Sequence, residues 1–167
     1  MKKLKIVAIA LVLANSFWGC EKDDICSGDT PTTPNVVIEF YDAANPENLK
    51  TVTNLGVIAP GFTQGIGYNG VSKIEIPLKT NEDLTTLHFI QNGADEDTTN
   101  DNTDVLTFNY VRQEVYISRA CGFKTLFQLN DGNPVLTDGD ASLWIQSITV
   151  DHPYIQNENE THIKIYF

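Results

Sequence analysis

Residues Val105–Val111 (VLTFNYV) carry the pattern that decides the fold class of this chain. Three of the apolar residues in this stretch, Leu106, Phe108 and Tyr110, alternate with polar residues. A strand with one buried face has this period of two, because successive side chains point to opposite faces of a sheet. The stretch therefore predicts a half-buried antiparallel strand.

Similar runs recur along the chain, and no stretch after residue 20 has the 3.6-residue periodicity of an amphipathic helix. Turn-forming sequences separate several of the runs, among them Asn45-Pro46, Asn69-Gly70, Asp131–Pro134 and Asp138-Gly139. We expect strands at Val36–Tyr41, Lys50–Ile58, Val71–Leu78, Thr85–Ile90, Val105–Val111, Glu114–Ser118, Phe123–Leu129, Leu143–Val150 and His162–Phe167.

These runs predict one all-β domain over residues 35–167, an antiparallel β-sandwich of immunoglobulin-like or related type with about eight or nine strands. A closed β-barrel is the alternative, since short antiparallel strands can also close on themselves. Pro77 lies inside the run Val71–Leu78 and cannot donate a backbone hydrogen bond. We therefore expect that strand to lie at a sheet edge or to contain a bulge.

The chain is acidic, and this limits its partners. Its 167 residues include 22 Asp and Glu against 11 Lys and Arg, which gives a net charge of −11. Such a charge repels nucleic acid and disfavours electrostatic docking on anionic lipid. We expect no nucleic-acid partner.

Residues 1–19 have the parts of a bacterial lipoprotein signal peptide. Lys2, Lys3 and Lys5 form a basic region, and the uninterrupted apolar run Ile6–Ala14 follows. A helix of that length spans about 14 Å, less than half of a hydrocarbon core of about 30 Å. The segment therefore predicts a cleaved export signal and not a membrane-spanning helix.

Gly19-Cys20 resembles the end of the bacterial lipoprotein box, in which the cysteine thiol is acylated and the peptide is cut before it. We expect Cys20 to carry acyl chains such as palmitate and to anchor the protein in the outer membrane, on the periplasmic or the cell-surface face. Phe17 and Trp18 depart from the usual residues of the box. A plain secretory signal that leaves Cys20 as an ordinary cysteine is the alternative.

The acylated residue would begin a tether over residues 20–34, of which Ser27–Pro34 is rich in Ser, Thr, Pro and Gly. Its first residues, Glu21, Lys22, Asp23 and Asp24, resemble a signal that exports lipoproteins of Bacteroidota-type bacteria to the outer face of the outer membrane. The alternative is that this charged cluster is only a solvated part of the tether.

The chain has three cysteines: Cys20, Cys26 and Cys121. Export places them in an oxidising compartment, and acylation of Cys20 leaves two thiols that can pair. We expect a Cys26–Cys121 disulfide, with two buried free cysteines as the alternative. No Cys or His pair has the spacing of a metal site, so we expect no metal.

Several short motifs lie along the mature chain: Glu21–Cys26 (EKDDIC), Thr33-Pro34, Phe40–Asp42 (FYD), Ile76–Leu78 (IPL), Ser118–Gly122 (SRACG), and Asn157-Glu158 followed by His162–Ile165 (HIKI). Together they resemble a family of uncharacterised Bacteroidota lipoproteins of about the length of this chain. The resemblance covers nearly all of the mature chain and implies the lipid anchor. It also places both remaining cysteines in family motifs, and it implies no activity or catalytic residue.

Two loops have compositions that invite a ligand. Gly65–Gly70 reads GxGxxG, but a dinucleotide site needs a helix after this motif, and here a strand pattern follows, so we expect a flexible loop. Asn92–Asp104 is the most acidic stretch and lacks the residue order of a calcium loop. We expect it to be an exposed hairpin loop without a cation. Within it, Asp97–Thr99 resembles an acceptor of periplasmic O-glycosylation, which makes Thr98 a candidate.

No catalytic motif accompanies the three histidines, and we expect His88 and His162 at outward strand positions. Trp144 is expected in the core, with an exposed sugar-stacking aromatic as the alternative.

These features predict a lipid-anchored envelope protein that acts as a non-catalytic binding or structural module without a cofactor. Its expected partners are the membrane, through the anchor, and an outer-membrane protein or a polysaccharide. A carbohydrate-binding or adhesin-like surface domain is the first alternative and requires an exposed aromatic strip that includes Trp144. An envelope hydrolase is the second, and it requires a pocket that joins a histidine to a carboxylate and a nucleophile.

Overall fold

The computed structural model describes residues 25–140 and 142–167. These residues fall into two compact units. The smaller unit contains residues 25–30 and Tyr116–Phe123, and the larger contains Pro31–Val115 and Lys124–Phe167. The predicted signal peptide, Cys20 and the charged cluster Glu21–Asp24 lie outside the described residues.

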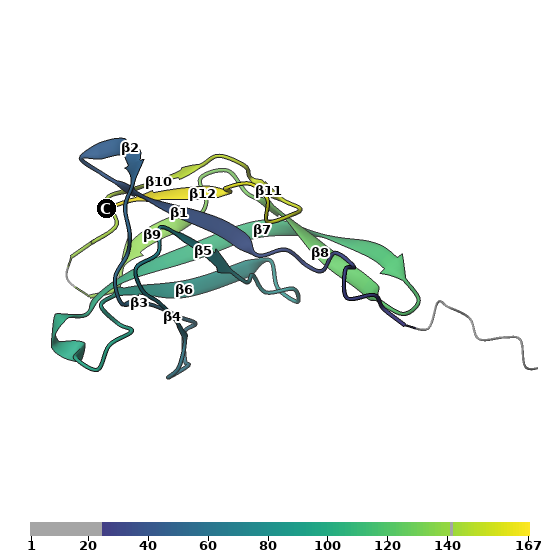
Figure 1. Cartoon of the computed structure of the whole chain (residues 1–167), viewed down its shortest axis with the longest axis horizontal. Helices are drawn as coiled ribbons and strands as arrows, with labels where there is room; N and C mark the ends of the chain where they lie inside the picture. The colour runs from purple at the N-terminus through teal and green to yellow at the C-terminus, as the bar shows by residue number, and fades with distance from the viewer. Residues whose placement is uncertain (1–24, 141) are drawn as a thin grey trace, which may run out of the picture. The chain divides into compact units, whose positions relative to one another are not determined.

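The first sheet of the larger unit is built around one long buried strand, β1. This strand pairs in parallel with β12 along one edge, and β12 pairs with β10 (Figure 1). Along its other edge β1 pairs with β5 through its first half and with β2 through its second half. The strands are β1 (Val36–Asp42), β2 (Asn45–Leu49), β5 (Lys73–Ile76), β10 (Ser147–Val150) and β12 (Ile163–Tyr166).

The second sheet has the order β11-β8-β7-β6-β3-β4, and β9 pairs with the first half of β7. Every pairing for which the structure gives a register in this sheet is antiparallel. The strands are β3 (Leu55–Ile58), β4 (Ile66–Tyr68), β6 (Leu84–Gln91), β7 (Asn102–Ser118), β8 (Gly122–Leu129), β9 (Val135–Asp138) and β11 (Tyr154–Ile155).

The buried faces of the two sheets share one hydrophobic core, which confirms the β-sandwich, and the sheets do not close into a barrel. Leu106, Phe108 and Tyr110 of β7 are at most 1% exposed, as their alternation predicted. They pack with core residues of the other sheet such as Phe40 and Ile165. The alternation therefore identified the buried face of β7 correctly.

The predicted break between Val105–Val111 and Glu114–Ser118 is wrong, because both runs belong to the single strand β7. The residues between them, Arg112 and Gln113, are polar but are not turn formers. Arg112 Nε donates a hydrogen bond to Asp83 Oδ1 at 2.6 Å, so this polar residue is held within the strand by a neighbouring segment.

Four short strands were missed by the sequence analysis: β2, β4, β9 and β11. Asn45-Pro46 lies in β2 and is not a turn; this strand is exposed throughout and lies at a sheet edge, where proline is tolerated. Residues 66–68 of the GxGxxG segment form β4, so the expectation of a flexible loop is wrong there. These strands have few buried side chains, so they leave little alternation to detect.

Three predicted strands are shorter than expected, since Lys50–Ile58 contains only β3, Val71–Leu78 contains only β5 and Leu143–Val150 contains only β10. The expectation for Pro77 is confirmed, because β5 ends at Ile76 and pairs only with β1. Among the described residues, no helix has the length and apolar character needed to cross a membrane.

Candidate functional site

An apolar pocket of about 200 Å³ lies in the larger unit, where the edge strands of the two sheets come together. The residues of β3, β4 and β6 on one side and the end of β5 on the other form its walls. Its lining consists of Val57, Ala59, Phe62, Gln64, Gly65, Ile66, Ile76, Pro77 and Leu87. Pockets for drug-sized ligands measure roughly 300–1,000 Å³, so this pocket suits a smaller apolar group.

The loop between β3 and β4, residues 59–65, forms the outer wall of this pocket. The Phe62 N–H donates to Ala59 O at 3.2 Å, and Gly61 adopts a φ of +82°, so the loop turns sharply there. Phe62 is left 71% exposed at the rim. Gly65 then returns the chain to β4, and a Cβ at this position would lie 2.3 Å from Val57 O. Only glycine allows this close approach.

The chemistry of the pocket is that of apolar contact. Among its lining residues only Gln64 has a polar side chain, and none is ionisable. His88 follows the lining residue Leu87 on β6, and successive side chains on a strand point to opposite faces. The pocket can therefore desolvate an apolar group, and its lining supplies no acid, base or nucleophile.

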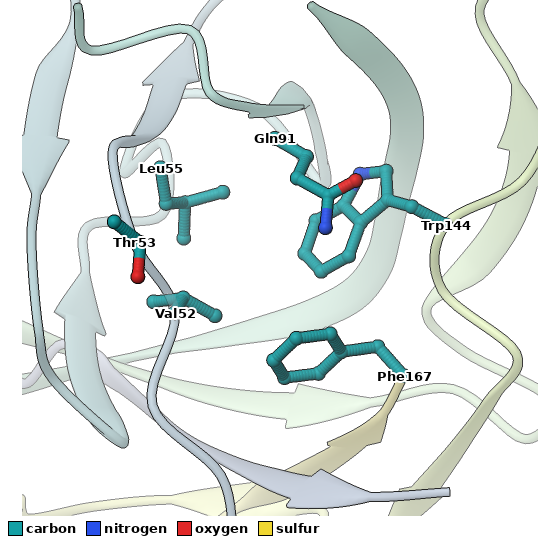
Figure 2. Close-up of a pocket in the computed structure, with 6 residues that line it drawn as sticks. All are labelled: Val52, Thr53, Leu55, Gln91, Trp144 and Phe167. Carbon is teal, nitrogen blue, oxygen red and sulfur yellow. The ribbon is translucent and has the colours of Figure 1, made fainter.

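A second pocket lies beside Trp144, with Val52, Thr53 and Leu55 on one side and Trp144 with Phe167 on the other (Figure 2). Its volume is about 20 Å³, which corresponds to room for about one water molecule. Trp144 is 7% exposed, and its indole N–H donates to Phe89 O at 3.0 Å. The prediction of a core tryptophan is confirmed, and Trp144 is not part of an exposed aromatic strip.

Asp104 corrects the expectation that the whole of Asn92–Asp104 is an exposed loop. It lies within β7 and is 0% exposed, with Oδ2 accepting hydrogen bonds from the backbone N–H groups of Trp144 (3.1 Å) and Ile145 (2.7 Å). Oδ1 has no hydrogen-bond partner. Burial raises the pKa of Asp104 above its usual value, although the two N–H groups act in the opposite direction. The carboxylate holds the segment before β10 in place.

The exposed part of the acidic stretch, residues 94–100, is organised by its own side chains. Asp97 accepts hydrogen bonds from the N–H and Oγ1 of Thr99, which lower the pKa of Asp97 and cap the 3-10 turn η2 (Thr98–Asn100). Thr98 is exposed in this turn. Within the described ranges, no three His, Cys, Asp or Glu side chains gather in a way that could hold a metal ion.

His162 is fully buried, so the expectation of an outward position is wrong for this residue. Its Nδ1 accepts a hydrogen bond from the Val37 N–H at 2.9 Å, whereas Nε2 has no hydrogen-bond partner. Burial lowers the pKa of the imidazole, and Glu160 acts in the opposite direction. His162 joins the start of β12 to β1, which is a structural role.

The smaller unit is held together by a disulfide between Cys26 and Cys121, with a Cα–Cα distance of 4.9 Å. This confirms the predicted pairing. The same unit contains three exposed apolar residues: Ile25, Tyr116 and Phe123 are 83%, 56% and 64% exposed. The sequence pattern does not mark Tyr116 and Phe123 as exposed, because their exposure depends on where β7 and β8 turn.

One family model matches the chain over residues 55–167, and it describes a family of unknown function (DUF6452). The matched region contains both pockets in large part and Cys121, and it does not include Cys20 or Cys26. No curated protein and no solved structure shows significant similarity to the chain.

Proposed function

We propose that this chain, which belongs to the DUF6452 family of unknown function, is a lipid-anchored, non-catalytic binding module of the bacterial outer membrane. The basic and apolar parts of residues 1–19 and the Gly19-Cys20 pair support the anchor. The resemblance of several short motifs, such as EKDDIC at Glu21–Cys26, to those of Bacteroidota lipoproteins favours the same assignment. The module would bind a partner in the envelope while its acyl chains hold it at the membrane.

The apolar pocket is the observation that carries the binding role. Its lining is almost entirely apolar, and Phe62 and Ile66 at its rim are 71% and 45% exposed. Buried apolar anchors that fill small pockets dominate the binding energy of many protein interfaces. The partner is therefore an envelope protein that inserts one apolar side chain or aromatic ring between the sheet edges.

The two alternative functions receive less support from the described residues. A sugar-binding strip was expected to include Trp144, which is buried. A hydrolase needs a pocket that joins a histidine, a carboxylate and a nucleophile, whereas the lining of the apolar pocket contains none of the three. The binding module fits the pocket's lining better.

The anchor can be tested with Cys20→Ser and a matched Cys26→Ser variant. Expressed in an envelope-competent bacterium with labelled palmitate, Cys20→Ser should lose the label and the membrane association, and Cys26→Ser should keep both. Incorporation of label into Cys20→Ser would contradict the anchor.

The pocket can be tested by photo-cross-linking from a reactive amino acid at Gln64 in the native envelope. Ile66→Asp should lower the yield of the cross-linked partner about tenfold, equivalent to about 1.4 kcal/mol of binding free energy. Val135→Asp is the matched control, because Val135 is 44% exposed on β9 and lies outside the pocket. Equal loss in both variants, or no product from Gln64, would contradict binding at the pocket.

Two finer assignments belong to the same proposal. Replacing Glu21, Lys22, Asp23 and Asp24 by alanine should abolish exposure to extracellular protease if they direct export to the cell surface.

Thr98 lies exposed in the turn η2, as a glycan acceptor must. Thr98→Val should then remove the glycan mass from the protein isolated from its own envelope.

A further inference from the structure

The smaller unit has exposed apolar side chains that are not packed in a hydrophobic core. Tyr116 at the end of β7 and Phe123 at the start of β8 stack edge to face, with ring centroids 5.3 Å apart. Both rings are more than half exposed, and Ile25 in the same unit is 83% exposed. We call Ile25, Tyr116 and Phe123 the aromatic tip. Exposed large apolar groups gathered in one place mark an interaction surface.

The disulfide fixes the aromatic tip to the tether. Cys121 lies in the turn between Tyr116 and Phe123, where its N–H donates to Ser118 Oγ at 3.0 Å and Gly122 has a φ of +70°. The bond to Cys26 joins this turn to the residue next to Ile25. The disulfide therefore cross-links the turn between β7 and β8 to the N-terminal segment.

The sequence places this unit close to the proposed acylation site. Cys26 follows Cys20 by six residues, and six residues span at most about 20 Å when fully extended. The Cα–Cα distance of 4.9 Å across the disulfide places Cys121 within about 25 Å of Cys20. The aromatic tip is thus held near the membrane surface whenever Cys20 is acylated.

We propose that the aromatic tip inserts into the interface of the lipid bilayer beside the acylated Cys20, an inference that rests on the anchor of the proposed function. Tyrosine suits the headgroup level of a bilayer because its ring is apolar and its hydroxyl is polar, and phenylalanine reaches the acyl boundary. The tether makes this insertion intramolecular, so a small apolar contact is sufficient. Insertion sets the orientation of the hairpin turn at the membrane.

Apolar insertion, and not charge, would hold the tip at the bilayer. The chain has a net charge of −11, and the tip's three side chains are uncharged. The contact should therefore form on zwitterionic phosphatidylcholine and should persist at high salt, because screening weakens only charge interactions. Anionic lipid should not strengthen it.

The test uses the lipidated, processed protein bound to phosphatidylcholine vesicles with brominated acyl chains, which quench tryptophan fluorescence on contact. Tyr116→Trp places the reporter in the tip, and Val135→Trp is the control at a position 44% exposed in the larger unit. The signal of the buried Trp144 is subtracted with the unsubstituted protein. The reporter at position 116 should be quenched at least about threefold more than the reporter at position 135.

A further variant separates the disulfide from the anchor. In Cys26→Ser/Cys121→Ser with Tyr116→Trp, the protein should still sediment with the vesicles, and quenching at position 116 should fall towards that of the control. Sedimentation with equal quenching at positions 116 and 135 would overturn the insertion alone. Failure of the unsubstituted protein to sediment would overturn the anchor and, with it, this inference.

Discussion

At the residue scale, two buried ionisable side chains show how the core constrains this protein. Asp104 and His162 are each 0% exposed, and each has one polar atom without a hydrogen-bond partner. Burial favours the neutral form of both, so it raises the pKa of Asp104 and lowers that of His162. Each residue also ties together segments far apart in the sequence. Their titration should therefore be visible in the stability of the fold.

The free energy of unfolding of Asp104→Asn, relative to that of wild type, should increase as the pH rises. The folded-state pKa of Asp104 lies above its ordinary value of 3.8, so wild type loses stability as the pH rises from 3.8 through the folded-state pKa. Asparagine keeps an oxygen that can accept from the Trp144 and Ile145 N–H groups, and it has no charge to bury. Urea unfolding of both proteins at several pH values measures this difference.

Asp104→Ala is the contrasting variant, because it leaves the same two N–H groups without an acceptor. An unsatisfied buried group costs about 1–3 kcal/mol, so the two together should lower the free energy of unfolding by about 2–6 kcal/mol. Equal stability of the alanine and asparagine variants would contradict the role of the carboxylate as an acceptor.

His162 should make wild type lose stability on mild acidification. The folded-state pKa of His162 lies below its ordinary value of 6.5, so its contribution is present above pH 6.5 and is lost as the pH falls from 6.5 towards the folded-state pKa. His162→Gln keeps an acceptor for the Val37 N–H and does not titrate. Thermal unfolding should show a smaller decrease in Tm for this variant than for wild type over that pH range. Equal decreases in the two proteins would contradict the assignment of the pH dependence to His162.

At the element scale, the edge formed by β3 and β4 determines the pocket. The strands pair with Gly56 opposite Gly67, and the preceding loop enters β4 through Gly65. Small residues let the loop lie directly against β3, which places Phe62 and Ile66 at the pocket rim. Gly65, the first glycine of the GxGxxG motif, therefore serves close backbone packing here.

Gly65→Ala should therefore distort the pocket edge. The added Cβ would lie 2.3 Å from Val57 O and 2.4 Å from Ile58 Cγ1, so backbone must move. We expect a loss of about 1–3 kcal/mol in the free energy of unfolding, as for other overpacked sites, together with weaker cross-linking from Gln64.

The matched control for this prediction is Gly67→Ala, whose Cβ would meet only Ala94 Cβ at 3.3 Å. Its effect on unfolding should stay below about 1 kcal/mol, since a methyl group on an exposed loop can move. If both variants lose the same stability in urea unfolding, then close packing at Gly65 is not the cause.

At the scale of the whole molecule, the chain forms two compact units, and the disulfide belongs to the smaller one. The larger unit has its own hydrophobic core, to which neither cysteine contributes. The bond closes a sequence separation of 95 residues, so it constrains the unfolded chain strongly. The contribution of the disulfide to the free energy of unfolding can thus be measured separately from its proposed effect on insertion of the aromatic tip into the bilayer.

Cys26→Ser/Cys121→Ser should lower the free energy of unfolding by at most about 4.7 kcal/mol, the chain-entropy value for a loop of about 100 residues. The loss should be smaller than this limit because Cys26 is exposed and the sandwich core does not depend on it. Urea unfolding of the variant, compared with reduced and oxidised wild type, measures the loss. A variant that does not fold would show that the disulfide also supports the larger unit.

The sequence by itself determined the fold class, the buried face of β7 and the disulfide. The alternation of Leu106, Phe108 and Tyr110 with polar residues indicated which face of β7 is buried, because this pattern depends only on local strand geometry. Of the three cysteines, the expected acylation of Cys20 in an exported protein left two that could pair. These features are readable because each follows from residue spacing or from residue number.

Only the tertiary structure decided the fate of the polar residues and the existence of the pocket. Asp104 and Leu106 lie two residues apart on one strand and so share a face, which made the burial of Asp104 visible in principle. The backbone N–H groups that donate to its carboxylate, however, come from the distant residues Trp144 and Ile145. The pocket likewise needs residues near 57–66 and 76–87, which meet only when two sheet edges approach. A local pattern records which way a side chain points, whereas burial and satisfaction of a polar group depend on distant segments that long-range packing brings together.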